Sequence, residues 1–152
     1  MPAPPPHDAL RDRWKNSPQP LGLARDAEAT VNDLESRYRL RLPSDFRLYL
    51  TKSAPAEDLW DDGMNWWSVD HVRNISDEYQ HPISDAEVAA EAASYLFFAD
   101  YMIWSWAWAI CCGDGPNRGK IAVISSPDRF VASSFSEFVG GYLRDPEGTC
   151  CP

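Results

Sequence analysis

One stretch of the chain decides the fold: residues 96–112 read LFFADYMIWSWAWAICC. From Met102 onward, large and small side chains alternate, which is the period of a β-strand because successive side chains point to opposite faces. The aromatic and β-branched content also favours a strand over a helix. The larger side chains of the predicted strand share one face: Met102, Trp104, Trp106, Trp108, Ile110 and Cys112. Three Trp side chains on one face need a surface to pack against, in this chain or in another molecule.

The residues after this strand predict a β-hairpin. Residues 113–119 are rich in Gly, Asp, Pro and Asn, and residues 120–125, KIAVIS, form a second apolar run. Two apolar runs joined by a loop of this composition are typical of paired antiparallel strands. Further short strands are expected at residues 128–132 and near Trp66-Trp67.

The two faces of the central strand predict how the rest of the chain packs. The face with Ser105, Ala107 and Ala109 carries small side chains, so helices are expected to approach it closely. The opposite face is expected to receive other Trp rings of the chain. The candidates are Trp14, Trp66 and Trp67. We therefore interpret the three Trp residues of this strand mainly as core residues.

Helices are predicted where apolar side chains recur at helical spacing. The expected helices span residues 9–14, 26–38, 44–52, 84–93 and 134–143. Four of them start with a residue whose side chain commonly accepts a hydrogen bond from the first turn. These capping residues are Asp8, Ser44, Ser84 and Ser134. Gly140-Gly141 weakens the last helix by about 1 kcal/mol per Gly relative to Ala, and the helix could end there.

Length and composition indicate one folded domain. The chain has 152 residues, 44% of them hydrophobic, and seven Trp, which suits a single packed core. We assign residues 1–23 to a Pro-rich N-terminal extension with a short helix, residues 24–144 to the domain and residues 145–152 to a C-terminal tail. No run of about 18 apolar residues predicts a membrane-spanning helix. Residues 1–8 lack the basic and apolar regions of a signal peptide, so a cytoplasmic location is expected.

The charge of the chain is concentrated in one segment. Residues 55–92 hold ten acidic residues and one Arg, so their net charge of −9 equals that of the whole chain. This acidic balance argues against sequence-independent binding to nucleic acid and against binding to anionic membranes. A protein partner with a basic surface is the remaining expectation.

The acidic segment also carries three Trp residues, which gives it the composition of a protein-binding face. Aromatic side chains supply anchors, and carboxylates steer a basic partner. In the alternative interpretation the Trp residues fill the core and the carboxylates keep the protein soluble, and composition alone does not separate the two. The predicted partner-binding residues are Trp60, Asp61, Asp62, Trp66, Trp67, Asp70, Asp77 and Glu78.

The common catalytic and metal-binding patterns are missing from the sequence. None of the three His residues has the spacing of a zinc site, and His71 beside Asp70 is expected to be a surface pair. Residues 113–120 lack the glycine and hydroxyl positions of a phosphate-binding loop. The four Cys residues form adjacent pairs at 111–112 and 150–151; the first pair is expected to be buried and the second to lie in a frayed tail. We expect no catalytic residues, no metal site and no cofactor, unless His71, Asp70 and another carboxylate converge in a deep pocket.

Several segments, taken in order, resemble the SUKH superfamily. Its opening signature is a helix with a Glu-containing motif, then Leu-Pro and a second helix, and its closing helix begins with a Ser-Phe-x-x-Phe pattern. The similar segments are 31–38 (VNDLESRY), 42–50 (LPSDFRLYL), 96–100 (LFFAD), 108–110 (WAI) and 131–138 (VASSFSEF). The resemblance covers about residues 24–143.

The resemblance implies an α+β fold, with a largely antiparallel sheet packed by helices, and a non-enzymatic protein-binding role. Bacterial members of the superfamily are mostly immunity proteins that neutralise a cognate toxin, often a nuclease, and a fungal branch regulates cell-wall synthesis. The expected function is therefore that of an immunity protein that binds a basic toxin domain through the acidic, Trp-bearing face. The alternative is a regulatory or scaffold protein of the same fold that binds cellular proteins with no toxin involved. A toxin gene beside this one would favour the first.

Overall fold

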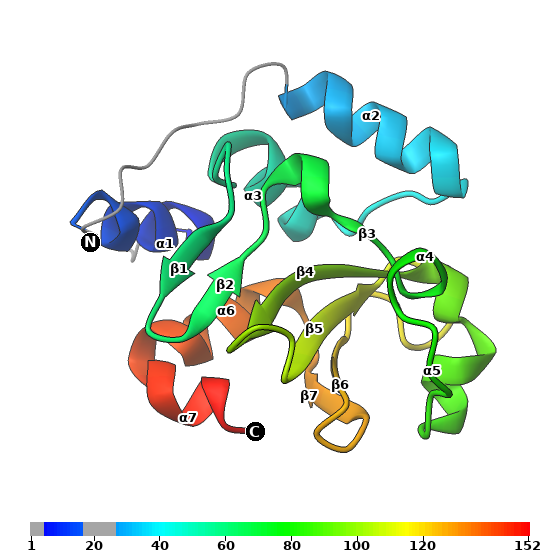
Figure 1. Cartoon of the computed structure of the whole chain (residues 1–152). Coiled ribbons are helices and arrows are strands. Elements are labelled where there is room, and N and C mark those ends of the chain that lie inside the picture. The colour runs from blue at the N-terminus through cyan, green and yellow to red at the C-terminus, as the bar shows by residue number, and fades with distance from the viewer. Residues whose placement is uncertain (1–4, 17–26) are drawn as a thin grey trace.

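A seven-stranded sheet runs through the part of the chain that the computed structural model describes, residues 5–16 and 27–152 (Figure 1). Every strand pairing in it is antiparallel. Six strands follow the spatial order β1 (Leu59–Asp61), β2 (Met64–Trp66), β4 (Tyr95–Tyr101), β5 (Trp106–Cys111), β6 (Ile121–Ile124) and β7 (Arg129–Ala132). The seventh, β3 (Arg73–Asn74), pairs with β4 along the same edge as β2. The predicted α+β fold with a largely antiparallel sheet is confirmed.

Helices cover both faces of this sheet. The larger cluster of buried residues draws on α1 (Pro6–Lys15), α2 (Ala27–Tyr38), α3 (Ser44–Lys52), α6 (Phe135–Arg144) and α7 (Pro146–Cys150). The smaller cluster, on the other face, draws on α4 (Ile75–Glu78) and α5 (Ala86–Ala90). Two single turns, η1 (Val69–His71) and η2 (Ala92–Ser94), complete the connections around β3. Within residues 5–16 and 27–152, no helix combines the length and the apolar character that crossing a bilayer requires.

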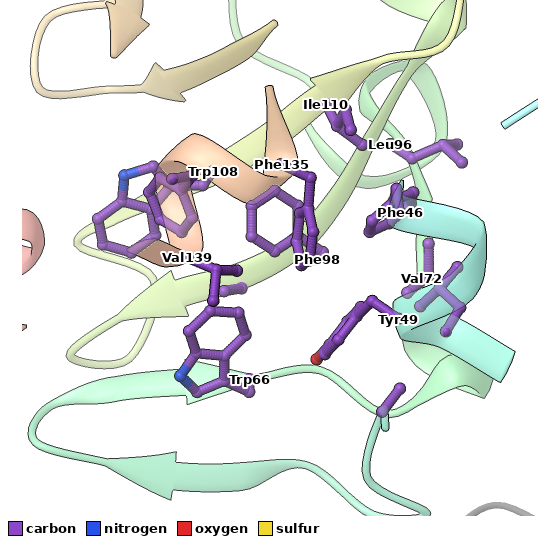
Figure 2. Packing of buried hydrophobic residues seen from close by; sticks show 14 of the residues in the cluster. Phe46, Tyr49, Trp66, Val72, Leu96, Phe98, Trp108, Ile110, Phe135 and Val139 are labelled. Atoms are coloured by element: carbon purple, nitrogen blue, oxygen red, sulfur yellow. The ribbon is translucent and has the colours of Figure 1, made fainter. Parts of the chain in front are cut away.

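The larger cluster is built around aromatic rings from the sheet and from α6. Figure 2 shows Trp66, Phe98 and Trp108 gathered in this core, and all three are fully buried. Their ring centroids lie 6.3, 5.5 and 5.9 Å from that of Phe138 on α6. Trp14 of α1 joins them, with its ring 5.3 Å from Trp66. The short helix assigned to an N-terminal extension therefore packs into the core of the domain.

The long helices pack on the Trp face of the central strand, so the prediction that they cover its small-residue face is wrong. Ala107 and Ala109 instead lie in the smaller cluster with the rings of Trp67 and Phe97. Short side chains on a sheet leave space above them, and close packing requires that space to be filled. Here aromatic rings from the sheet and from the loop after β2 fill it.

The strand predicted from Met102 onward is wrong at its start, because residues 102–105 form the turn of the β4–β5 hairpin. Met102, Ile103 and Trp104 have φ angles of 46°, 56° and 61°, a left-handed conformation that costs an L-residue about 1–2 kcal/mol. The turn is held by Asp100, whose carboxylate accepts a hydrogen bond from the backbone N–H of Trp104 at 2.8 Å. Trp104 packs against the smaller cluster. Trp106 and Trp108, which follow the turn, pack with the larger cluster.

The predicted cap of the helix in residues 84–93 is also wrong. Ser84 donates its backbone N–H and its hydroxyl to the carboxylate of Asp128, at 2.6 and 2.9 Å, so its side chain is engaged outside the helix. The next residue, Asp85, caps α5 by accepting hydrogen bonds from the N–H groups of Glu87 and Val88, both at 3.0 Å. The helix consequently starts later than predicted, and it ends at Ala90.

Of the three other predicted capping residues, one is confirmed and two are wrong. Ser134 caps α6 as predicted, with its hydroxyl accepting the N–H of Glu137 at 3.0 Å. Ser44 is instead the first residue of α3, after Pro43, and α1 begins before Asp8; neither helix has a side-chain cap. The φ angle of proline is fixed at a value that suits the start of a helix. A proline directly precedes both helices, Pro5 before α1 and Pro43 before α3.

The helix predicted over residues 134–143 is confirmed as α6, and the predicted C-terminal tail contains a further helix, α7. The glycine pair at 140–141 does not end α6, which continues to Arg144. Cys150, expected in a frayed tail, is buried in α7, and its carbonyl accepts the indole N–H of Trp106 at 3.0 Å. Cys151 is exposed. The tail assigned to residues 145–152 therefore contributes a helix to the larger cluster.

Gly63 is required in the turn between β1 and β2. Its φ is +88°, and a Cβ there would lie 2.7 Å from a ring carbon of Tyr101. We expect Gly63→Ala to lower the free energy of unfolding by about 1–2 kcal/mol, because Ala adopts a left-handed conformation at that cost. Urea denaturation measures the change. Gly140→Ala is the matched control, since it lies inside a helix where Ala is favoured; equal stability of Gly63→Ala and the wild type would contradict the expectation.

Candidate partner-binding surface

The predicted partner-binding residues do not form one face. Trp66 and Trp67 are both fully buried and belong to different core clusters. They are consecutive, and successive side chains of an extended chain point to opposite faces, so one enters each core. Neither ring is available to a partner, and their inclusion in the predicted surface is corrected.

Asp61 is also structural. Its carboxylate accepts hydrogen bonds from Arg13 Nε at 2.7 Å, from the Tyr142 hydroxyl at 2.6 Å and from the Trp14 indole at 3.3 Å. Burial by itself would raise the pKa of this carboxyl, but the bonds from Arg13 and Tyr142 and the Arg13 charge outweigh it and lower the pKa. Asp61 therefore connects α1 and α6 to the β1–β2 hairpin through these hydrogen bonds.

Three further acidic residues of the prediction lie between β2 and α5, with Asp70 in η1 and Asp77 and Glu78 in α4. Asp70 is exposed. Asp77 is exposed as well and accepts a hydrogen bond from the Tyr38 hydroxyl at 2.6 Å. Glu78 is half-buried; it pairs with Arg73 at 3.5 Å and accepts the indole N–H of Trp104 at 3.3 Å. Of the eight predicted residues, four are exposed: Trp60, Asp62, Asp70 and Asp77.

His71 pairs with Asp58 rather than with Asp70, so the predicted surface pair is wrong. Its Nδ1 lies 2.8 Å from a carboxylate oxygen of Asp58, and its ring stacks on Trp67 at 3.7 Å and 9°. Asp58 also accepts the backbone N–H of Ser68 at 2.8 Å. Burial opposes ionisation of Asp58, but hydrogen bonds from His71 and Ser68 lower its pKa overall. This pair attaches the loop after β2 to the start of β1.

An exposed apolar tip stands where two hairpin turns meet. Ile103 is 92% exposed and Met102 48% exposed, in the β4–β5 turn, and Trp60 on β1 is 45% exposed. The two turns are joined by a hydrogen bond from the Met102 N–H to the Gly63 carbonyl, at 3.0 Å. We call the exposed side chains of Trp60, Asp62, Met102 and Ile103 the hairpin-tip surface.

Sequence reasoning found Trp60 and Asp62 of this surface and missed Met102 and Ile103, which it placed in a strand. The signal that indicates the turn is the flanking pair of Asp100 and Ser105, because Asp and Ser side chains often bond to nearby backbone in turns. Ser105 does this too, donating its hydroxyl to the Met102 carbonyl at 2.9 Å. The aromatic residues of this stretch favour a strand, and the strand prediction is based on them.

Residues of the β4–β5 hairpin help to line two hollows. The first, of about 370 Å³, is lined by Asp62, Tyr101, Glu147, Cys150 and Cys151. The second, of about 440 Å³, is lined by Glu78, Tyr79, Gln80, His81, Trp104 and Ser125. Met102 and Ile103 lie between them along the chain, since Tyr101 lines the first and Trp104 the second. Exposed apolar side chains near carboxylates can bind a protein whose apolar surface is ringed by basic side chains.

The described residues offer little for metal or thiol chemistry. Within residues 5–16 and 27–152, no group of three or more His, Cys, Asp or Glu is placed to hold a metal ion. Cys111 and Cys112 are free and buried, as expected. Burial raises the pKa of the Cys112 thiol, and it raises that of Cys150 to about 12. A high thiol pKa disfavours the reactive thiolate.

Comparison with known proteins adds no assignment: no protein-family model matches the chain, and no curated protein matches it significantly.

Proposed function

We propose that this protein is a non-enzymatic, immunity-type inhibitor that neutralises a toxin by binding its basic domain. The observation that carries the proposal is the acidic segment, residues 55–92, which supplies the entire net charge of −9 and also supplies Trp60 and Asp62 of the hairpin-tip surface. A strongly acidic segment that also exposes an aromatic side chain favours a basic protein over nucleic acid or an anionic membrane. The α+β fold and the resemblance to the SUKH superfamily are consistent with this role.

A basic toxin domain fits this charge for a physical reason. A nuclease binds phosphates and therefore carries a positive surface. Opposite potentials on the two proteins steer their encounter and raise the association rate, and salt screens that effect. The inhibitor would thus bind its target fast at low salt and more slowly as the ionic strength rises.

The salt dependence tests this proposal with the purified protein and a basic nuclease toxin domain encoded beside its gene. We expect the association rate to fall at least about tenfold between low salt and about 0.5 M salt. Asp62→Lys should lower the rate further at low salt, because it reverses an exposed charge of the hairpin-tip surface. Surface plasmon resonance measures both rates.

The matched control for that experiment is Asp33→Lys, which makes the same charge change at an exposed position of α2. It alters the net charge equally but leaves the hairpin-tip surface intact. An association rate that does not respond to salt would refute the electrostatic basis of the proposed function. Equal effects of the two substitutions would show that net charge, and not this surface, guides the encounter.

A further inference from the structure

The β4–β5 turn exposes the most accessible large apolar side chain among residues 5–16 and 27–152. Ile103 is 92% exposed, and its neighbour Met102 is 48% exposed. Burying these side chains in the core would gain hydrophobic stabilisation, yet the turn directs them to solvent. Neighbouring apolar residues that are both exposed and lie near polar side chains are typical of a protein-binding site.

The turn keeps this exposure by means of an unfavourable backbone. Ile103 has a φ of 56° between two further residues of positive φ, and a β-branched residue rarely adopts this conformation. The surroundings fix it: Ser105 N–H donates to the Tyr101 carbonyl at 2.8 Å. Trp104 is held by Asp100 at 2.8 Å and stacks on Tyr79 at 5.3 Å and 7°. The tip is therefore preorganised, and binding need not order it.

The carboxylates near the β4–β5 turn favour a partner with basic side chains. Asp62 and Glu147 line the first hollow, and the residues that line it include no Lys or Arg. Asp62 is 65% exposed although it pairs with Arg13 at 2.8 Å, and Glu147 is exposed. A carboxylate accepts several hydrogen bonds, so a second cation from a partner can bind beside Arg13.

We propose that the β4–β5 turn is the apolar anchor of the complex: Ile103 enters an apolar pocket of a basic protein, and Lys or Arg side chains around that pocket reach the carboxylates of Asp62 and Glu147. This rests on the proposed function, which concerns the class of partner, and adds the residues that bind it. It also places the centre of the interface on the β4–β5 turn, outside the acidic segment itself.

The test uses the full chain, immobilised as wild type, Ile103→Asn, Ile103→Asp and Leu48→Asp. Leu48 is the matched control because it is 42% exposed on α3, a helix that contributes no residue to the hairpin-tip surface. The probe is a cell extract divided on a cation exchanger into a retained, basic fraction and an unretained fraction; each is applied at low salt and eluted first with high salt and then with denaturant. Quantitative mass spectrometry compares the proteins retained by each variant, and calorimetry with the purified basic protein then gives its affinity.

We expect the wild type and Leu48→Asp to retain the same basic protein, and both Ile103 variants to bind it at least about tenfold more weakly. Ile103→Asn should unfold at the same temperature as the wild type or above it, because Asn accepts a positive φ far more readily than Ile. Loss of binding in a variant that folds at least as well cannot come from misfolding. A photo-crosslinker in place of Ile103 should also label an apolar segment of the partner flanked by Lys or Arg.

Two other outcomes separate the anchor from the proposed function. If Ile103→Asn and the wild type bind the basic protein equally, the anchor is refuted and the proposed function stands. If the wild type retains no basic protein that salt releases, the proposed function fails and the anchor with it. A partner that depends on Ile103 but carries no basic surface would overturn the assignment of the partner's chemistry.

Discussion

Replacing Trp66 with Ala is expected to lower the free energy of unfolding by about 3–5 kcal/mol, the cost typical of removing a large aromatic side chain from a core. Trp66 is fully buried. Its ring lies 5.2 Å from Tyr142, 5.3 Å from Trp14 and 6.2 Å from Tyr49, so the cavity would open where three helices meet β2. Urea denaturation followed by far-ultraviolet circular dichroism measures the loss.

Trp60→Ala is the matched control, since it makes the same change six residues earlier on the same hairpin. Trp60 is 45% exposed, so its truncation should change the free energy of unfolding by less than about 1 kcal/mol. The comparison also tests the division of the acidic segment into core and surface Trp residues. Equal losses for the two variants would contradict that division.

Asp61→Ala is expected to destabilise the fold by about 2–4 kcal/mol, because it leaves Arg13, Trp14 and the Tyr142 hydroxyl without their common acceptor. The Asp61 side chain is 14% exposed, so water replaces the lost bonds poorly. Asp62→Ala removes a neighbouring carboxylate that is 65% exposed, and its effect should stay within about 1 kcal/mol. Thermal and urea denaturation of both variants check the difference.

The same carboxylate makes stability depend on pH. Although burial disfavours the charged form, the hydrogen bonds and charge of its partners lower the pKa of Asp61 in the folded state. A lowered folded-state pKa means that the stabilisation is complete above the unfolded-state value, about 3.9, and is lost as the pH falls through the folded-state value. Asp61→Asn should therefore lose less stability than the wild type as the pH is lowered from about 5 toward 2. Parallel losses in the two proteins would refute this link.

Much of the fold could be predicted because its elements carry local signals. The apolar stripe of α2, which buries Val31 and Leu34, and the stripe of α6, which buries Phe135 and Phe138, recur at helical spacing. The β5–β6 hairpin follows from two apolar runs joined by a polar loop, with Trp108 opposite Val123 in the register. Such patterns depend only on neighbours in the sequence.

The turn at residues 102–105 escaped prediction because local preference and tertiary contacts disagree there. Its alternating aromatic pattern favours a strand. The structure instead bends the chain because the buried carboxylate of Asp100 bonds the Trp104 backbone at 2.8 Å and the Trp67 indole at 2.6 Å. The second partner lies 33 residues away, so a local window of sequence contains the bond to Trp104 but not the contact with Trp67.

The candidate surface was found only in part for a similar reason. A count of charges locates residues 55–92, and it marks Trp60 and Asp62 correctly as exposed. It cannot show that Asp61 bonds Arg13, 48 residues away, or that Trp66 and Trp67 enter opposite cores. Composition identifies which segment carries charge, and the three-dimensional contacts decide which of its side chains reach solvent.

The contact between Asp61 and Tyr142 has a consequence for biosynthesis. It joins residues 81 positions apart, and the bond from Ser136 to Asp45 joins residues 91 positions apart. Ribosomes add about 5–20 residues per second, so those 81 residues take about 4–16 s to follow Asp61 out of the peptidyl-transferase centre. Until α6 emerges, Trp14 and Trp66 lack the helix that closes over them, and the nascent chain presents aromatic surface that chaperones recognise. The protein can thus complete its core only after α6 has been synthesised.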